Sequence, residues 1–222
     1  MNEAVPITQV LVHARDPGIV QVCRQVCDQL RWQCRTGSIE PPALLGGDAT
    51  LHVVENHAGR DLPRALGQPT ALLVCDAVAL QRLVGGGAHA FAAYQLRPMR
   101  AERLQEQLRR LRLGQDGNLA QCVRVGPLVL DAMDRRVVWQ GEVLSLTWRE
   151  YELLQVLVRH RGTVVTRDRI EAAMYRWGQE LGSNAIEVFV HALRSKTHPA
   201  LIATVRGEGY QLMDLDSAGH LG

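Results

Sequence analysis

Short apolar runs alternate with stretches of helical period through the first half of the chain. Runs typical of buried strands fall at residues 8–13, 32–35, 51–55, 71–75 and 91–96, and amphipathic stretches fall at 17–30, 76–84 and 99–113. Pro and Gly pairs break the stretch 36–50, and residues 62–66 predict a short helix at most. Strands that alternate with helices favour a parallel sheet with helices on both faces. We therefore predict a doubly wound, flavodoxin-like α/β domain with five parallel strands over residues 1–113.

The second half places short strands before its helices. β-prone runs fall at 122–125, 128–130, 136–139 and 143–146, with a tight hairpin at Gln140-Gly141. Thr147 and Glu150 form a capping box, because each side chain satisfies a free backbone amide at the start of a helix. A second helix follows at 167–175. These elements predict a small antiparallel sheet followed by helices.

The stretch 183–213 carries the pattern with the most functional content. Its apolar positions recur at helical spacing: Ile186, Phe189, Val190 and Leu193. His198-Pro199 ends this helix, since proline cannot continue it. The runs 201–205 and 210–213 are joined by a glycine-rich connection typical of a hairpin. The pattern alone fits either an ordinary amphipathic helix beside a hairpin or a DNA-binding helix with its wing.

Composition indicates where the protein is located and limits the basic charge available for binding DNA. No apolar run approaches the ~20 residues needed to span a bilayer, and the N-terminus lacks a signal-peptide pattern. Five cysteines, an odd number, fit a reducing cytoplasm, where we expect this protein. Residues 1–113 carry 13 basic and 10 acidic side chains, and the remainder carries 12 and 13. A DNA-binding second half would therefore need a local basic patch, made by Arg194, Lys196 and Arg206.

Three ordered segments of the second half resemble the winged helix-turn-helix domain of OmpR/PhoB-family transcription regulators. They are LTWREYELLQVLVRHRGTVVTRDRI, SNAIEVFVHALRSK and LIATVRGEGYQL. The resemblance implies an α+β domain over residues 122–214 whose helix at 184–196 enters the major groove, with the wing over an adjacent minor groove. It implies contacts with double-stranded promoter DNA from Asn184, Glu187, Val188, His191, Ala192, Arg194, Ser195, Thr204, Arg206 and Tyr210.

This helix departs from the family pattern where relatives often carry basic residues. The departures are Phe189, Ala192 and Ser195, together with His191 in place of an arginine. Each lost phosphate contact weakens binding to all sequences alike. We therefore expect looser or differently specified binding with Arg194 and Arg206 as the main anchors, while Val188 and Ala192 can meet thymine methyl groups.

Residues 7–112 resemble the receiver domain of bacterial response regulators, and the best local match is Tyr94-Gln95-Leu96-Arg97-Pro98. The family needs an acidic pair for Mg²⁺, a phosphoacceptor aspartate, a Ser/Thr and a lysine. Here those positions fall on Ala14, Arg15, Asp16, Glu55, Val74, Cys75 and Arg97. The resemblance thus implies a degenerate receiver in which the acceptor position holds a glutamate.

The chemistry of phosphorylation is disfavoured at these positions. A cation at Arg15 opposes Mg²⁺, and without the metal the charge on carboxylate and phosphate is uncompensated. We predict no phosphorylation, no metal and no cofactor. Two interpretations of Glu55 stay open: a permanent ion-pair cluster with Arg15 and Arg97, or a solvated carboxylate at a strand end.

The leading hypothesis is a sequence-specific, DNA-binding transcription regulator that acts as a homodimer without Asp phosphorylation. Family members dimerise through the fourth helix, fifth strand and fifth helix, a face that here carries Glu102, Arg103, Glu106, Arg109 and Arg110. The alternative is an interaction protein that docks on RNA polymerase or another regulator with marginal DNA binding. Relatives contact the polymerase through the loop 177–182, which runs from Trp177 to Gly182 here.

The linker, the C-terminal tail and the cysteines give further predictions. Residues 114–121 are expected to be a turn-rich linker, and 215–222 a flexible tail. Cys23, Cys27 and Cys34 suggest redox sensing or metal binding, but free cysteines are more often small buried hydrophobes. No nucleophile with a base, no metal set and no cofactor loop is found, so we do not expect an enzyme.

Overall fold

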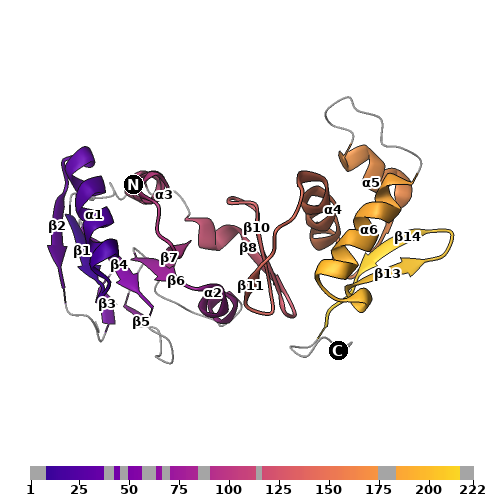
Figure 1. Cartoon of the computed structure of the whole chain (residues 1–222), viewed down its shortest axis with the longest axis horizontal. Helices are drawn as coiled ribbons and strands as arrows, with labels where there is room; N and C mark the ends of the chain where they lie inside the picture. Colours follow the sequence, from indigo (N-terminus) through magenta and orange to yellow (C-terminus); the bar gives the residue numbers. More distant parts are fainter. Residues whose placement is uncertain are drawn as a thin grey trace. The chain divides into compact units, whose positions relative to one another are not determined.

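The computed structural model describes residues 9–37, 43–45, 50–56, 64–66, 71–84, 91–113, 117–174 and 184–215. The chain divides into two compact units, residues 1–122 and 123–222. Each unit has its own sheets and its own hydrophobic core (Figure 1). Within the described ranges, no helix is long and apolar enough to cross a membrane.

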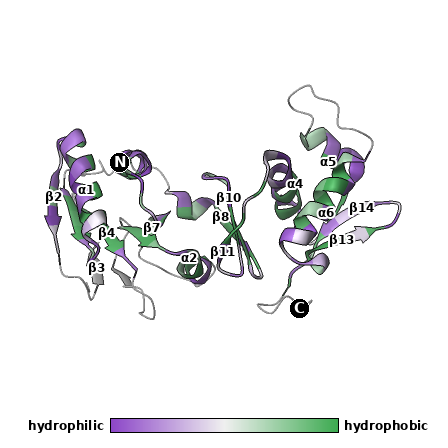
Figure 2. Ribbon diagram, in the orientation of Figure 1, coloured by the Kyte–Doolittle hydropathy of each residue, from purple (hydrophilic) through white to green (hydrophobic). Residues whose placement is uncertain are grey.

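The first unit is built on a five-stranded parallel sheet. Its strand order is β2 (Gln33–Thr36), β1 (Gln9–His13), β4 (Thr50–Glu55), β6 (Ala71–Cys75) and β7 (Phe91–Leu96). Figure 2 shows β4 and β7 mainly in hydrophobic colours and the edge strand β2 in hydrophilic ones. Strands between two others are buried on both faces and therefore read as continuous apolar runs, such as ALLVC in β6.

Helices lie on both faces of this sheet, so the predicted doubly wound arrangement is confirmed. They are α1 (Pro17–Leu30), α2 (Ala77–Leu83) and α3 (Ala101–Arg112). Helices α1 and α3 share one core with alternate residues of the strands, and Figure 1 shows α2 on the other side of β6 and β7 from α3. Helix α1 starts where predicted, because Asp16 accepts a hydrogen bond from the Gly18 N–H at 2.8 Å and Pro17 fills the first turn.

Two short segments differ from the prediction. Part of the predicted helix at 62–66 is strand β5 (Arg64–Leu66), and strand β3 (Ala43–Leu45) lies within the stretch expected to be irregular. These strands pair in parallel as a separate two-stranded sheet. A three-residue run is too short to show a period, so its partner strand decides its conformation.

The predicted linker at 114–121 is shorter than expected. Its second part forms a 3₁₀-helix, η1 (Asn118–Gln121), in which Asn118 and Leu119 are buried. Asn118, one of the residues that indicated a linker, instead binds the backbone of Tyr94 through its side-chain amide. Residues 117–121 therefore belong to the first unit.

The second unit opens with a four-stranded antiparallel sheet. Its order is β11 (Glu142–Val143), β10 (Arg136–Trp139), β9 (Leu128–Asp131) and β8 (Cys122–Val125). Gln140 and Gly141 have positive φ angles of 49° and 83°, as the predicted tight hairpin requires. The strand expected at 143–146 is reduced to β11, because the Ser145 carbonyl instead accepts from Lys196 and Thr147 caps the next helix.

Three helices and a three-stranded sheet complete the second unit. They are α4 (Trp148–Arg159), β12 (Val164–Thr166), α5 (Arg167–Met174), α6 (Ala185–Lys196), η2 (Pro199–Leu201), β13 (Ile202–Val205) and β14 (Gly209–Leu212). The sheet order is β12, β14, β13, and the β13–β14 hairpin is the wing. The predicted capping box is present, and the α+β winged-helix prediction is confirmed.

The C-terminal boundary also shifts. Leu215, predicted as the first residue of a flexible tail, is 2% exposed and belongs to the core. Its carbonyl lies so close to Gly126 that a Cβ there would be 2.0 Å from it. The folded part of the second unit therefore includes Leu215, and residues 216–222 lie outside the described ranges.

Candidate functional site

Helix α6 has a buried face and an outward face. The buried side chains are Ile186, Val190 and Leu193, as the periodicity predicted, and Phe189 packs partly against the same core. The outward positions recur at i, i+3, i+4 and i+7: Val188, His191, Ala192 and Ser195. Val188 is 60% exposed, His191 and Ser195 are also exposed, and Ala192 is half-buried, so polar and apolar side chains share this outward face.

Ion pairs fix both ends of α6. Arg167 on α5 binds both carboxylate oxygens of Glu187, with Nη2 to Oε2 at 3.0 Å, and donates to Glu171 at 3.1 Å. Lys196 Nζ donates to Glu150 Oε2 at 2.6 Å. A bidentate pair fixes orientation even where solvent screening limits its contribution to stability. Glu187, a predicted DNA contact, is thus engaged by Arg167 in this structure.

Arg194 ties α6 to the wing. Its Nε donates to the Ile202 carbonyl at 3.0 Å, and its Nη2 donates to the same carbonyl and to the Thr204 hydroxyl at 2.8 Å. These bonds join the last turn of the helix to strand β13. Arg194, predicted as a main phosphate anchor, is thus bound to the wing in this structure.

The wing depends on glycine at its base. Gly209 has a φ of 155°, and a Cβ there would lie 2.1 Å from the Val165 carbonyl oxygen of β12. Arg206 is exposed at the turn between the two strands. Tyr210, a predicted DNA contact, is 8% exposed and packs in the core, and burial raises the pKa of its hydroxyl. Of these residues, the structure leaves Arg206 accessible.

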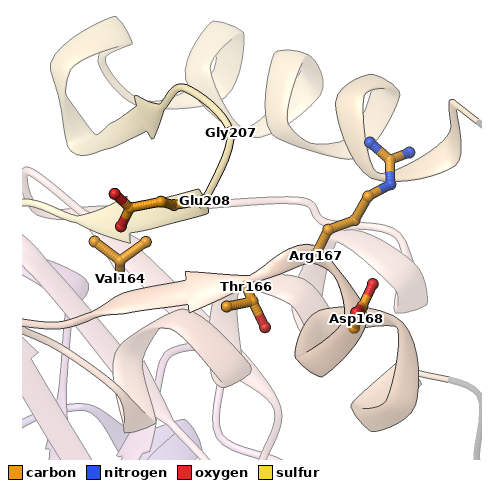
Figure 3. Close-up of a pocket in the computed structure, with 6 residues that line it drawn as sticks. All are labelled: Val164, Thr166, Arg167, Asp168, Gly207 and Glu208. Carbon is orange, nitrogen blue, oxygen red and sulfur yellow. The ribbon is translucent and has the colours of Figure 1, made fainter.

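A hollow of about 410 Å³ lies between the wing turn and the start of α5. Six residues line it and are shown in Figure 3: Val164, Thr166, Arg167, Asp168, Gly207 and Glu208. In Figure 3 the Arg167 guanidinium and the Glu208 carboxylate point away from each other. The mixed charge of the lining, with Arg167 already bound to Glu187, does not favour an anion.

In the first unit, Glu55 lies at the end of β4 with its side chain only 3% exposed. Its Oε2 accepts from the backbone N–H groups of Arg15 at 2.6 Å and Asp16 at 3.1 Å. Its Oε1 accepts from Arg97 Nη2 at 2.7 Å, and the same nitrogen donates to the Asn56 carbonyl at 3.0 Å. The interpretation of Glu55 as a solvated carboxylate is therefore wrong.

The cluster predicted around Glu55 is confirmed for Arg97 and takes a different form at Arg15, which contributes its backbone N–H. Burial favours the neutral acid, but the bonds from Asp16, Arg15 and Arg97 outweigh it and hold the pKa of Glu55 below its ordinary value. The carboxylate is thus charged at neutral pH, and both of its oxygens accept hydrogen bonds.

The residues at this site do not fit Mg²⁺. Glu55 is occupied by three donors, and Asp16 caps α1 and lies 3.8 Å from Arg97 Nη1. No group of three or more His, Cys, Asp or Glu side chains in the described part of the chain is arranged for a metal ion. Val74 and Cys75, at the Ser/Thr position, are fully buried, and Ala14 packs partly in the core.

The residues predicted for a dimer face lie on helix α3 and differ in exposure. Glu102, Glu106 and Arg109 are exposed, whereas Arg103 and Arg110 are half-buried. The buried side chains between them are Leu104, Gln107 and Leu108. An intersubunit contact on this helix would therefore involve Glu102, Glu106 and Arg109.

The cysteines behave as core residues. Cys23 and Cys27 are fully buried, and burial raises the pKa of both thiols, that of Cys27 to about 12. Cys34 is half-buried beside Cys27, and its pKa is raised by burial too. Thiols held protonated are poor nucleophiles, which favours the structural interpretation. Cys75 is also buried, and Cys122 is partly exposed.

Sequence reasoning missed the contacts that tie these elements together. The Arg167–Glu187 pair, the Arg194–wing bonds and the Lys196–Glu150 pair join residues separated by between 8 and 46 positions. Charged side chains on different elements follow no common sequence period, so these contacts could not be predicted from the sequence. The loop 177–182 lies outside the described residues.

A family model described as "Transcriptional regulatory protein, C terminal" matches residues 141–212. The response regulator protein PmrA of Pseudomonas aeruginosa is 38% identical over 117 residues, which are 53% of this chain and 53% of PmrA. The transcriptional regulatory protein QseB of Escherichia coli is 35% identical over 158 residues, which are 69% of this chain and 72% of QseB. The chain thus spans about half the length of PmrA and more of QseB.

The QseB match reaches beyond the second unit, because its 158 residues exceed the 100 residues of that unit. Among solved structures, the response regulator DrrB of Thermotoga maritima, an OmpR/PhoB homologue, is similar over 93% of this chain and 99% of DrrB. Its identity is 18% and its TM-score 0.44.

Proposed function

Because this chain belongs to the OmpR/PhoB family of transcriptional response regulators, we propose that it binds specific promoter sequences as a dimer and needs no aspartyl phosphate. Family membership makes it a DNA-binding transcription regulator and not an enzyme. We further propose which residues contact DNA, that the protein acts as a dimer, and that it does not depend on phosphorylation.

The outward stripe of α6 is the observation that carries the DNA contact. Val188 is 60% exposed and can meet a thymine methyl group in the major groove. His191 lies on the same stripe and can donate a hydrogen bond to a base edge or a phosphate. The Ser195 hydroxyl donates to the His191 carbonyl at 3.0 Å and can accept a hydrogen bond from a base edge. Asn184, exposed before the first turn, lies at the end of the helix where phosphates are favoured.

Arg206 supplies the phosphate contact in this proposal. It is exposed at the wing, while Arg194 and Lys196 are engaged by Thr204 and Glu150. Thr204 is itself exposed and lies beside Arg194, so the helix and wing meet DNA as one rigid surface. Glu187 is held by Arg167 and so is kept from repelling phosphates freely.

The saturated carboxylate of Glu55 supports independence from phosphorylation. A phosphoacceptor must be free to attack, and both oxygens of Glu55 already accept hydrogen bonds. The guanidinium of Arg97 is held where it would meet a phosphoryl group in a typical receiver. We propose that this degenerate receiver has one permanent arrangement.

A two-fold contact through α3 fits the order of its exposed charges. Glu102 and Glu106 lie in the first part of the helix, and Arg109 lies in the last turn. Two antiparallel copies of α3 then place acids opposite bases. Such rim pairs add little affinity, but they fix the register of the dimer. A contact between RNA polymerase and the loop 177–182 stays a proposal.

Selection of bound sequences from random duplex DNA tests this function. Full-length protein should enrich half-sites spaced about one helical turn apart. Arg206→Ala should weaken binding to all sequences and lower the salt dependence by about one unit. Val188→Ser should relax preference at one base position by about 1 kcal/mol.

The matched control is Arg159→Ala, an exposed arginine on the side of α4 that meets the four-stranded sheet. It should leave affinity and salt dependence unchanged. If no sequence is enriched, or Arg206→Ala and Arg159→Ala bind alike, direct DNA recognition is wrong. The interaction-protein hypothesis would then replace it.

A further inference from the structure

Lys196, in the last turn of α6, is the only lysine of the chain. A lysine at the end of a DNA-binding helix is ordinarily expected to contact phosphate. Here its Nζ is turned toward the protein, where it donates to Glu150 Oε2 at 2.6 Å and to the Ser145 carbonyl at 3.0 Å. Ser145 precedes α4 and Glu150 lies in its first turn, so Lys196 joins the end of α6 to the start of α4.

The acceptor of this bond is a buried carboxylate that also caps α4. Glu150 is 5% exposed, and the same Oε2 accepts from the Thr147 N–H at 2.7 Å. Burial favours the neutral acid, but the bonds from Lys196 and Thr147 outweigh it and hold the pKa of Glu150 below its ordinary value. Glu150 is therefore charged at neutral pH, and removing Lys196 would leave a buried charge without its cation.

Helix α6 is thus held near both ends. Arg167 binds Glu187 in the first turn, and Glu150 binds Lys196 in the last. The two points are nine residues apart, roughly 14 Å along a helix. Between them α6 packs against α4, beside which it lies in Figure 1. Apolar packing permits small shifts of a helix, whereas two short ion pairs at separate points fix both its position along its axis and its rotation.

We propose that Lys196 and Glu150 are positioning residues for DNA recognition, which fix the orientation of α6 in the major groove without a phosphate contact from Lys196. This inference rests on the proposed function, since it needs α6 to be the helix that contacts the bases. Base contacts depend on the register of a helix in the groove, so a change at the α4 end of this pair reaches the outward stripe of α6.

A positioning role reverses the sign that charge alone predicts for Glu150→Gln. By charge alone, this change removes an acid and frees Lys196 for phosphate, so binding should tighten and the salt dependence should rise by about one unit. In a positioning role, the change releases the end of α6 and binding weakens. Lys196→Met, which keeps the length of the apolar stem, should weaken binding as well and leave the salt dependence unchanged.

The test measures the affinity of the full chain for its selected DNA site and for the same site with one base pair changed, over a range of salt concentrations. Glu150→Gln and Lys196→Met should each weaken binding to the selected site about fivefold to tenfold and reduce the preference over the changed site. The double variant should bind no more weakly than either single variant, because both remove one and the same link.

Glu152→Gln is the matched control. It removes a carboxylate of the same helix that pairs with Arg149 at 3.1 Å, within α4 itself. This variant should keep the affinity, the preference and the salt dependence of wild type. All proteins are measured below their unfolding temperatures, so that a loss of stability alone does not change the affinity.

Three results would overturn the inference. Tighter binding by Glu150→Gln, or a salt dependence lower by about one unit in Lys196→Met, would make Lys196 a phosphate contact. Lower thermal stability with unchanged affinity and preference in both variants would make the pair purely structural. Wild type separates these results from the proposed function: without any sequence preference in wild type, the proposed function is wrong and the inference falls with it.

Discussion

Replacing Glu55 with alanine is expected to lower the free energy of unfolding of the first unit by about 2–4 kcal/mol. The change leaves the N–H groups of Arg15 and Asp16 without their acceptor and removes the carboxylate that balances Arg97. The estimate lies below that of a fully buried pair because the Arg97 side chain is 37% exposed. Hydrogen exchange of peptides from β1 and β4 measures it without interference from the second unit.

Glu106→Ala is the control, because it removes an exposed glutamate of α3 and should change stability by less than about 0.5 kcal/mol. Equal free energies of unfolding of the two variants would mean that the Glu55 cluster does not stabilise the first unit. Acid provides a second check. Since the pKa of Glu55 is lowered on folding, its contribution is complete above the unfolded value of about 4.3 and is lost as pH falls through the folded pKa. Glu55→Gln should remove this acid sensitivity from the first unit only.

Gly209→Ala is expected to have a similarly large effect in the second unit. The new Cβ would lie 2.1 Å from the Val165 carbonyl and 2.9 Å from the Thr166 Cα, and both are backbone atoms that cannot move aside alone. We expect a loss of about 3 kcal/mol or more, because β14 must separate from β12. Since the wing hairpin moves with β14, affinity for DNA should fall at least as far as in Arg206→Ala.

Gly207→Ala is the matched control two residues away. Gly207 also has a positive φ, of 77°, but nothing lies within 4 Å of a Cβ there. Its cost should be only the conformational one of about 1 kcal/mol. Thermal unfolding and DNA affinity of the two variants should differ clearly. If the two variants have equal thermal stability and DNA affinity, close packing at Gly209 is not what fixes the position of the wing.

Elements whose cause is local were predictable from the sequence. The start of α1 follows from Asp16 and Pro17, the start of α4 from the capping box, and the buried face of α6 from its period. The position of Glu55 at the end of β4 followed from the resemblance of the strand pattern to a receiver. Its pairing with Arg97 was one of two interpretations that the sequence left open. Its bonds from the Arg15 and Asp16 N–H groups were not predictable, because backbone N–H groups leave no signal in residue types.

Features that depend on distant partners were not predictable. Arg194 looked like a DNA anchor because exposed helical arginines usually face solvent, yet the carbonyl of Ile202 lies within its reach. Tyr210 matched a family contact position, but its alternation along β14 places it in the core. Asn118 stood in a turn-rich stretch typical of a linker. Its amide is buried only because the edge of β7 lies beside it.

The most direct test of the account is binding of the full chain to its selected DNA site before and after treatment with Mg²⁺ and a small-molecule phosphodonor. The protein's intact mass is recorded in parallel. We predict the same affinity in both states and no gain of a phosphoryl group, because both oxygens of Glu55 already accept hydrogen bonds. A stable phosphoryl adduct accompanied by tighter DNA binding would contradict it.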